Sequence, residues 1–287
     1  MAFAQNLEKC FHILTQGQTY TEEELCIKLE DALLLCNKFS LVNREIVILH
    51  NPDKKEAEFQ LKRNWNTDCP AGTVKRCLLG DMLYVIYSPG QKKCRIFLMK
   101  NHLKRGTEFI NRFYTEVARL DLLSSRSVFT LEGQENSCDF LSKAEVRSIA
   151  DYGIFHKVKG YYDMQIFSAD LSTPLQEFGV EPRRVFVFRG TMDQHRVSAP
   201  NWIEDYEGYG SLRSFGRAIE DMRIGQPVTQ NWKDELIDHL RGMDEMEIPK
   251  DFCEMEIDFL QGAYEKESSF DFLQSIGSIV LINVDEE

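Results

Sequence analysis

The chain has 287 residues, of which 43% are hydrophobic, and it carries a formal net charge of −12 at pH 7. A chain of this length and composition can bury one large core or two modest ones, which indicates a globular protein. It contains no run of about 18 consecutive apolar residues, and its start has neither a basic segment nor the apolar core of a signal peptide. We therefore expect a cytoplasmic protein that does not interact with membranes.

The cysteines do not indicate a disulfide framework or a zinc site. A chain of this length does not need disulfides to be stable, and no Cys-x-x-Cys or His/Cys cluster has the spacing of a zinc site. We expect reduced cysteines packed in the core. The eight residues are Cys10, Cys26, Cys36, Cys69, Cys77, Cys94, Cys138 and Cys253.

The charge is distributed unevenly along the chain. Residues 41–126 carry 16 Lys and Arg against 9 Asp and Glu, whereas residues 220–287 carry 5 against 18. Such asymmetry is compatible with a phosphate-facing surface on the basic part and a partner-binding surface on the acidic C-terminal region. Ordinary solvated surfaces would explain it equally well, so charge alone leaves both nucleic acid and a protein partner open.

The first quarter of the chain predicts a helix followed by two strands. Thr21 precedes three glutamates and a helical apolar period, which is the pattern of a capped amphipathic helix over residues 21–38. Residues 45–50 and 58–62 have the composition of strands, and the Asn-Pro-Asp turn at 51–53 favours their pairing as antiparallel neighbours.

The strongest hairpin signal of the chain follows. Residues 79–87 and 94–102 are rich in aliphatic and aromatic residues and are joined by Ser-Pro-Gly-Gln at 88–91. After this hairpin, apolar residues at helical spacing predict a second helix over residues 107–123.

The remainder of the chain has a less regular pattern and shows no internal repeat. The charge shift and the Ser124-Ser125 break place a domain boundary near residue 126. The expected elements are a short helix at 142–152, strands near 153–158, 164–168 and 184–188, helices near 212–222 and 232–240, and a buried strand at 276–284.

The hairpin sets an acid opposite a lysine. If Tyr87 faces Cys94 across the turn, then Asp81 lies opposite Lys100, and the Cβ atoms of such a pair are about 5 Å apart. An acid and a lysine that project from adjacent apolar strands form the core of a metal-dependent phosphodiesterase site, in which the acid holds Mg²⁺ and the lysine stabilises charge. A half-exposed ion pair worth about 0 to 1 kcal/mol is the alternative.

Three segments carry a resemblance to a known family. Thr21-Glu22, the run Gly-Asp-Met-Leu-Tyr-Val-Ile at 80–86 and the run Ile-Phe-Leu-Met-Lys at 96–100 resemble the restriction-endonuclease-like PD-(D/E)xK phosphodiesterase superfamily. The resemblance implies an α/β (α+β) fold with a mixed sheet flanked by helices. Its restriction-endonuclease-like core would cover residues 1–126, and an accessory, helix-rich α/β region would cover residues 127–287.

The resemblance also implies the roles of individual residues. Glu22 would be the helix acid, Asp81 the metal-binding aspartate and Lys100 the catalytic lysine, with Mg²⁺ or Mn²⁺ as the cofactor. The middle acid of the family motif falls on Leu98, which cannot coordinate a metal. Glu58, on a strand expected nearby, is the candidate replacement as a second metal ligand.

Basic residues around the hairpin are candidates for contact with nucleic acid. His102 shares the predicted face of Lys100, although a surface histidine at a strand end is the simpler explanation. Lys104 and Arg105 would extend the basic edge beyond it, and Lys92 and Lys93 lie at the turn.

Taken with the resemblance, these features predict a nuclease-like hydrolase that binds nucleic acid or cleaves it as a metal-dependent endonuclease. The resemblance suggests a defence or mobile-element system. Because Leu98 departs from the motif, a catalytically inactive interaction protein with the same fold is the alternative, with the acidic C-terminal region as its contact surface.

A second alternative comes from the order of three other residues. Arg189, Ser211 and Glu256 occur in the order used by the ADP-ribosyltransferases with an Arg-Ser-Glu motif, which bind NAD. Ser211 also lies at the start of a predicted helix, where serine is a common N-cap.

Overall fold

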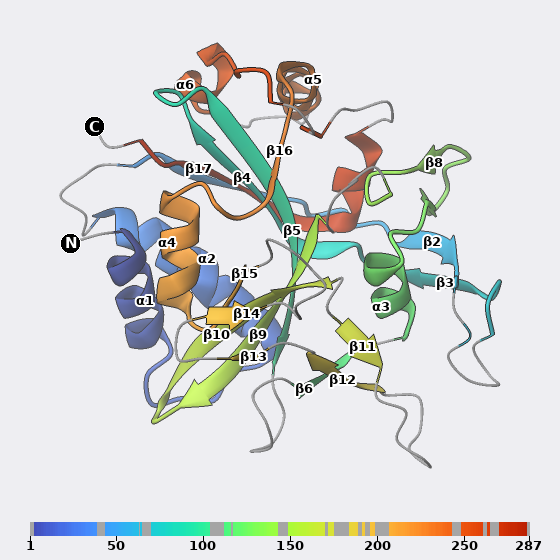
Figure 1. Ribbon diagram of the computed structural model, residues 1–287, viewed down its shortest axis with the longest axis horizontal. Helices are drawn as coiled ribbons and strands as arrows, with labels where there is room; N and C mark the ends of the chain where they lie inside the picture. The colour runs from blue at the N-terminus through green and yellow to red at the C-terminus, as the bar shows by residue number, and fades with distance from the viewer. Residues whose placement is uncertain are drawn as a thin grey trace.

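The computed structural model describes most of the chain. The described residues are 3–38, 44–62, 64, 70–103, 112–115, 117–142, 149–169, 172–174, 184–188, 191–192, 196–198, 207–242, 248–260, 263–264 and 270–285. Over these residues the fold is mixed α/β, with a mixed sheet flanked by helices (Figure 1).

The main sheet of the described part has ten strands. Strand β17 runs parallel to β4 and β5 runs parallel to β9, whereas the other neighbours are antiparallel. The order is β1 (Ile46–His50), β17 (Ile276–Asn283), β4 (Gly80–Ser88), β5 (Lys93–Leu103), β9 (Ala150–Val158), β10 (Tyr161–Ser168), β15 (Glu207–Tyr209), β14 (Arg196–Ser198) and β13 (Thr191–Met192), and β16 (Gln226–Pro227) also pairs with β5.

Two smaller sheets accompany it. One has the order β3 (Val74–Cys77), β2 (Ala57–Gln60), β7 (Phe129–Leu131) and β8 (Ser137–Cys138). The other has the order β11 (Ser172–Pro174), β12 (Arg184–Phe188) and β6 (Arg112–Thr115).

Each face of the main sheet packs against its own layer. Helices α1 (Phe3–Leu14), α2 (Glu22–Lys38) and α4 (Leu212–Glu220) share one core with one face of the sheet. Helices α3 (Val117–Ser124), α5 (Gln230–Arg241) and α6 (Lys250–Glu254), the 3₁₀ helix Phe270–Ser275 and the sheet of β2, β3, β7 and β8 share a second core with the other face.

The central strands are apolar on both faces because both faces are covered. In β4, Met82, Tyr84 and Ile86 belong to the core with α1 and α2, whereas Leu83 and Val85 belong to the opposite core. A strand that is buried on both faces has a nearly continuous apolar sequence instead of alternating apolar and polar residues. This explains the uninterrupted apolar runs of the predicted hairpin.

Several predicted elements are confirmed. The helix expected at 21–38 is α2, and the strand expected at 276–284 is β17. The hairpin is formed by β4 and β5, and its register pairs Tyr87 with Cys94 and Met82 with Met99, as expected from the Pro-Gly turn.

The predicted pairing of residues 45–50 with 58–62 is wrong. Strand β1 pairs with β17, and β2 pairs with β3 and β7 in the second sheet. The partner of Ile46 is Ile282, so this contact joins a strand from the first quarter of the chain to the strand nearest its C-terminus. The turn at 51–53 therefore leads the chain from one sheet to the other.

Two predicted helices are wrong in part. The helix expected at 107–123 corresponds only to α3, because residues 112–115 form strand β6 and pair with β12. The helix expected at 142–152 overlaps the start of β9, which lies between β5 and β10. Strand pairing with distant segments overrides the local helical period in both cases.

The main sheet takes strands from both sides of residue 126. Strand β17 lies between β1 and β4, and β5 pairs with β9. The boundary expected at residue 126 therefore does not separate two sheets. The second part of the chain, which was expected to be helix-rich, supplies strands β7 to β17 as well as α4, α5 and α6.

The expected burial of the cysteines is confirmed for most of them. Seven cysteines of the described residues are free thiols, and five of these are buried, namely Cys10, Cys36, Cys77, Cys94 and Cys138. Cys69 lies outside the described residues. Within the described part of the chain, no helix has both the length and the apolar character needed to cross a membrane.

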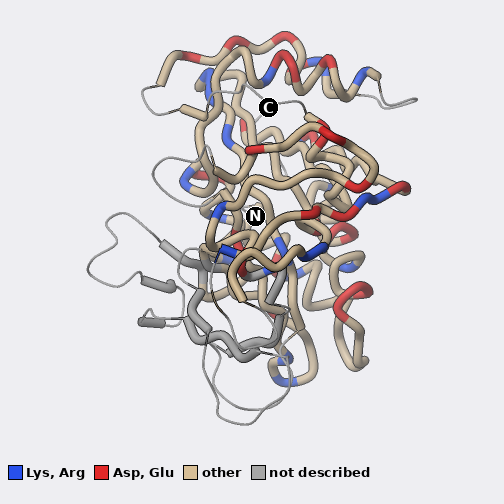
Figure 2. Tube along the Cα trace, turned by 90° about the vertical axis from the view of Figure 1, so that its right-hand side faces the viewer, with Lys and Arg blue, Asp and Glu red and all other residues tan. Residues whose placement is uncertain are grey.

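Acidic residues gather at one end of the molecule. Helices α5 and α6 lie at the top of Figures 1 and 2, and Figure 2 shows Asp and Glu positions recurring along this end. The turn of the β4–β5 hairpin lies at the same end, where Lys92 pairs with Glu256 at 3.7 Å. The C-terminal region thus contacts the turn of the hairpin, where Gly90, Gln91 and Lys92 remain exposed.

Gly225 lies where the segment after α4 packs closely against strand β5. Gly225 has φ of +81°, and an added Cβ would lie 2.6 Å from the carbonyl oxygen of Ile96. Gly72 has a similar φ of +85° but nothing within 4 Å of that position. We expect Gly225→Ala to lower the free energy of unfolding by about 3 kcal/mol or more, from left-handed strain plus overpacking.

The matched control, Gly72→Ala, has only the conformational cost of about 1–2 kcal/mol. Urea denaturation of both variants measures the difference. Equal losses in the two variants would contradict the close approach of Gly225 to β5.

Candidate functional site

The first turn of α2 places Glu22 over one end of the main sheet. The backbone N–H of Glu24 donates to Thr21 Oγ1 at 3.2 Å, and the backbone N–H of Thr21 donates to Glu24 Oε2 at 2.7 Å. This reciprocal pair is a capping box, which fixes where the helix begins. Glu22 is consequently the first residue of α2.

The carboxylates of Asp81 and Glu22 accept hydrogen bonds from backbone N–H groups near the end of β5. Strand β4 begins at Gly80, whereas its partner β5 continues to Leu103. Beyond Met82 and Met99, the last residues paired between the two strands, the backbone N–H of Asn101 donates to Asp81 Oδ2 at 2.7 Å, and that of Leu103 donates to Glu22 Oε2 at 2.9 Å. The two acids thus satisfy donors that would otherwise lack partners on this side of β5.

Lys100 lies between these two acids. Its Nζ is 2.5 Å from Asp81 Oδ1 and 3.9 Å from Glu22 Oε1, and its side chain is only 8% exposed. The structure therefore brings together the three residues expected to be catalytic, from α2, β4 and β5.

His102 is buried beside Glu22 and does not face solvent. Its Nδ1 lies 3.5 Å from Glu22 Oε2, and its ring stacks on that of Tyr152 with centroids 5.7 Å apart. Burial lowers the pKa of His102, and Glu22 opposes this effect. His102 is therefore not a surface histidine at a strand end, because its side chain is only 6% exposed and its ring packs against Tyr152 of the neighbouring strand β9.

The pKa of Glu22 is strongly lowered. Burial alone would raise it, but the hydrogen bond and charge of His102, the charge of Lys100 and the N–H of Leu103 together lower the pKa to about 2. Glu22 is therefore an ionised carboxylate at any physiological pH.

A cavity of about 730 Å³ opens beside this cluster, between α2 and the ends of β1, β4 and β17. Its lining holds five acids against two lysines, which is an excess of three negative charges. The lining residues are Glu22, Glu23, Cys26, Ile27, Glu30, Asp31, Leu34, Ile48, His50, Lys54, Leu78, Asp81, Met82, Lys100, Gly277 and Ser278.

Two residues that line this cavity, Glu30 and Ser278, were not predicted from the sequence. Glu30 Oε1 accepts from Ser278 Oγ at 2.7 Å, and Glu30 Oε2 lies 3.9 Å from His50 Nδ1. The helical spacing of Glu22, Cys26 and Glu30 is a signal that could have placed Glu30 beside Glu22. Ser278 had no such signal, because it comes from the C-terminal strand β17.

The structure does not bring Glu58 to the site. Glu58 lies on β2 in the second sheet, where its Oε2 accepts from Arg76 Nε at 2.7 Å. Leu98 is fully buried in the core, and an added Cβ on Gly80 would lie 2.5 Å from its Cδ1. The expected replacement of the middle acid by Glu58 is therefore wrong, and an apolar side chain occupies that position.

Two of the other residues expected to contact nucleic acid, Lys92 and Lys93, lie away from this site. Lys92 and Lys93 lie at the turn end of the hairpin, where Lys92 pairs with Glu256 and Lys93 Nζ donates to Gln91 at 3.4 Å. Lys104 and Arg105 lie outside the described residues.

The Arg-Ser-Glu alternative is not assembled in the described part of the chain. Ser211 is the N-cap of α4, on the face of the sheet with α1, and its side chain accepts from the N–H of Ser214. Glu256 is 83% exposed and pairs with Lys92 beyond the opposite core. Arg189 lies outside the described residues.

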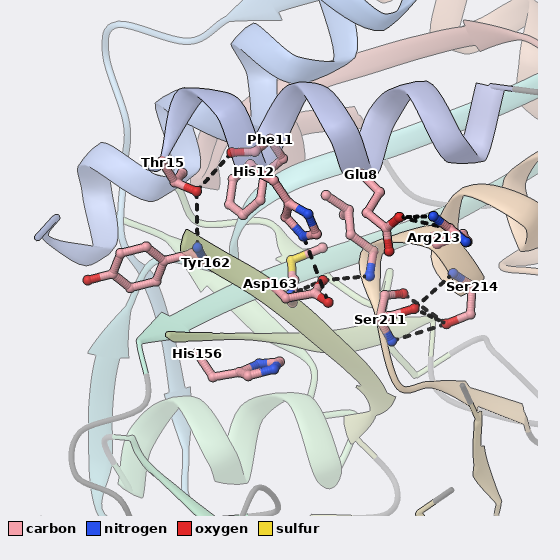
Figure 3. Close-up of polar contacts among 12 residues, drawn as sticks. Glu8, Phe11, His12, Thr15, His156, Tyr162, Asp163, Ser211, Arg213 and Ser214 are labelled. Atoms are coloured by element: carbon pink, nitrogen blue, oxygen red, sulfur yellow. Dashed lines mark hydrogen bonds and ion pairs between the residues drawn. The ribbon is translucent and has the colours of Figure 1, made fainter. Parts of the chain in front are cut away.

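A second cluster of potential metal ligands lies away from the cavity. Among the described residues, Glu8, His12 and Asp163 form the one group of three His, Cys, Asp or Glu side chains whose ligand atoms all lie within 4.8 Å of one another (Figure 3). Burial lowers the pKa of His12, while Asp163 and Glu8 raise it and Arg213 lowers it further.

Comparisons with protein-family models, with curated proteins and with solved structures gave no match to this chain.

The low pKa of Glu22 predicts a pH-dependent contribution to stability. A carboxylate with a folded pKa of about 2 and an unfolded pKa of about 4.3 stabilises the fold above the unfolded value. This stabilisation is lost as the pH falls through the folded value. We expect the difference in unfolding free energy between wild type and Glu22→Gln to be constant at neutral pH and to shrink between about pH 4.3 and 2.

Urea denaturation across this pH range measures that difference. Glu23→Gln, an exposed position in the same helical turn, is the control and should follow the wild type. A difference that stayed unchanged down to about pH 2 would contradict the ionised, hydrogen-bonded role of Glu22.

The ion pair of Asp81 and Lys100 predicts strong coupling between the two positions. Lys100→Met leaves the partly exposed carboxylates of Asp81 and Glu22 facing each other without their buried cation, which should cost about 1–3 kcal/mol of unfolding free energy. Adding Asp81→Asn should restore much of this loss, because it removes one of the unpaired charges. A double-mutant cycle from chemical denaturation measures the coupling, and additive losses would show that the pair does not interact.

Proposed function

We propose that the cavity beside α2 is the site of a nuclease-like activity, in which a divalent cation supports hydrolysis of phosphodiester bonds in nucleic acid. The observation that carries the proposal is the convergence of Glu22, Asp81 and Lys100 from three elements at the edge of one cavity. The defence setting implied by the family resemblance belongs to the same proposal.

The charge of the cavity supports a requirement for a cation. A lining with three excess negative charges repels phosphate, so a bound divalent ion has to offset this charge before a nucleic acid can approach. Mg²⁺ in phosphate-processing sites is held by one or two carboxylates, with water and substrate oxygens as its other ligands. Asp81 and Glu22 fit this requirement, and Glu30 is a third acid in the same lining.

A divalent ion bound there would activate a water molecule and polarise a phosphoryl oxygen. The chain's own contribution is preorganisation. The backbone N–H groups of Asn101 and Leu103, two residues apart on β5, fix one oxygen each of Asp81 and Glu22, so both acids are oriented by the same strand. The buried ammonium of Lys100 lies beside them, where it can stabilise negative charge that develops on a phosphoryl oxygen.

The second candidate is an interaction protein without catalysis. Two observations favour it: Leu98 occupies the position of the middle acid, and the oxygens of Asp81 already accept from Asn101 and Lys100. In this case Glu22, Asp81 and Lys100 would stabilise the uncovered end of β5, and the acidic surface of α5 and α6 would contact a partner.

A cleavage assay distinguishes the two candidates. Single- and double-stranded DNA and RNA are incubated with the full chain in Mg²⁺, in Mn²⁺ and in EDTA. We expect metal-dependent cleavage by the wild type and a loss of about 10²-fold or more in Asp81→Asn and Lys100→Met, because each removes a charge at the reacting group. Lys250→Met, an exposed lysine on α6, is the matched control and should cleave like the wild type.

The two candidate functions predict different results in this assay. Absence of cleavage by correctly folded wild type, as judged by circular dichroism, favours the interaction protein. Cleavage that persists equally in Asp81→Asn and Lys100→Met would overturn the assignment of the site.

A further inference from the structure

The cluster of Glu8, His12 and Asp163 lies where α1, β10 and α4 meet. Glu8 and His12 are four residues apart on α1, so their side chains lie on the same face of the helix. Asp163 extends toward them from β10, and the start of α4 lies beside them (Figure 3). None of the three residues lines the cavity beside α2.

Each carboxylate of this cluster has one oxygen fixed by the surrounding structure. Asp163 Oδ1 accepts from the N–H of Leu212 at 2.9 Å and from that of Met164 at 2.7 Å. Glu8 Oε2 accepts from Arg213 Nε at 2.8 Å and lies 2.5 Å from Arg213 Nη2. Supporting contacts of this kind orient the ligands of metal sites and hold them in place.

The imidazole of His12 points into the cluster. Its Nε2 is a buried atom for which the described residues provide no hydrogen-bond partner. It lies 4.0 Å from Asp163 Oδ2, which is too long for a hydrogen bond. The ring is held by contact with Tyr161, at a centroid distance of 4.0 Å.

The spacing of these atoms is slightly wider than that around a transition-metal ion. Ligand atoms around a tetrahedral ion with bonds of about 2.0–2.1 Å lie about 3.3 Å apart, so the 4.0 Å between His12 Nε2 and Asp163 Oδ2 would have to shorten by about 0.7 Å when an ion binds. The side chains of His12 and Asp163 are 22% and 14% exposed, and that of Glu8 is 16% exposed. The two acids face one arginine, so a cation would offset a negative charge that is largely shielded from water.

We propose that Glu8, His12 and Asp163 bind a divalent first-row transition-metal ion such as Zn²⁺. One imidazole nitrogen with two carboxylate oxygens favours such an ion over Mg²⁺ or Ca²⁺, which prefer oxygen ligands alone. The bound ion would link α1 to β10, and through the hydrogen bond of Asp163 with Leu212 it would also stabilise the start of α4. It would be distinct from the cation proposed at Asp81.

The test is a titration of the full, metal-free chain with Zn²⁺ by isothermal calorimetry, together with the visible and near-ultraviolet spectrum of the Co²⁺ complex. His12→Gln and Asp163→Asn remove one ligand each. Asn at position 163 keeps an oxygen that can accept from Leu212. His239→Gln, which removes a histidine from α5, is the matched control.

We expect the tightest Zn²⁺ site of the wild-type chain to bind one ion, with an affinity at least about tenfold weaker in His12→Gln and Asp163→Asn and unchanged in His239→Gln. The Co²⁺ spectrum should lack the near-ultraviolet charge-transfer band of thiolate ligands. The proposal is overturned by absence of binding to the wild type, by equal affinity in the wild type and both ligand variants, or by a thiolate band, which would assign the metal to the cysteines. Since the spectrum is read on the wild type, it remains decisive if a variant fails to fold.

Discussion

The feature on which the site depends is the unequal length of two paired strands. Strand β5 extends beyond Met99, its last residue paired with β4, so the backbone N–H groups of Asn101 and Leu103 lie outside the ladder of these two strands. The carboxylates of Asp81 and Glu22 accept from these groups, and Lys100 offsets their charge. Because a buried N–H without an acceptor is costly, the end of the sheet requires acceptors here, and the acids that provide them also form the edge of a cavity.

The two-layer cover of the sheet explains why this cluster is at a strand end. The middle of β4 and β5 is buried on both faces, where an unpaired charge would be costly to bury. The cluster of Glu22, Asp81 and Lys100 lies instead where β4 begins and the start of α2 is near. Leu98, deep in the core, is compatible with this fold although it departs from the motif of the superfamily that the sequence resembles.

The two clusters differ in their compensating charge. Between Asp81 and Glu22 a lysine ammonium occupies the centre, so a cation would have to bind beside it in the open cavity. In the cluster of Glu8, His12 and Asp163, the cation Arg213 contacts Glu8 from outside, and an imidazole nitrogen points to the centre. The first arrangement suits a transient ion that arrives with a phosphate, whereas the second suits an ion that is held for structural support.

The sequence alone determined the local elements: helix α2 with its Thr21 cap, the β4–β5 hairpin and its register, and the last strand. Turn residues and periodicity act over a few positions, so they placed Asp81 opposite Lys100. Only the tertiary structure decided that β1 pairs with β17, that Glu58 lies in another sheet and that Ser278 and Glu30 meet at the cavity. Those contacts join segments more than 200 residues apart or on different sheets, and they follow from the burial of apolar faces, which no local pattern encodes.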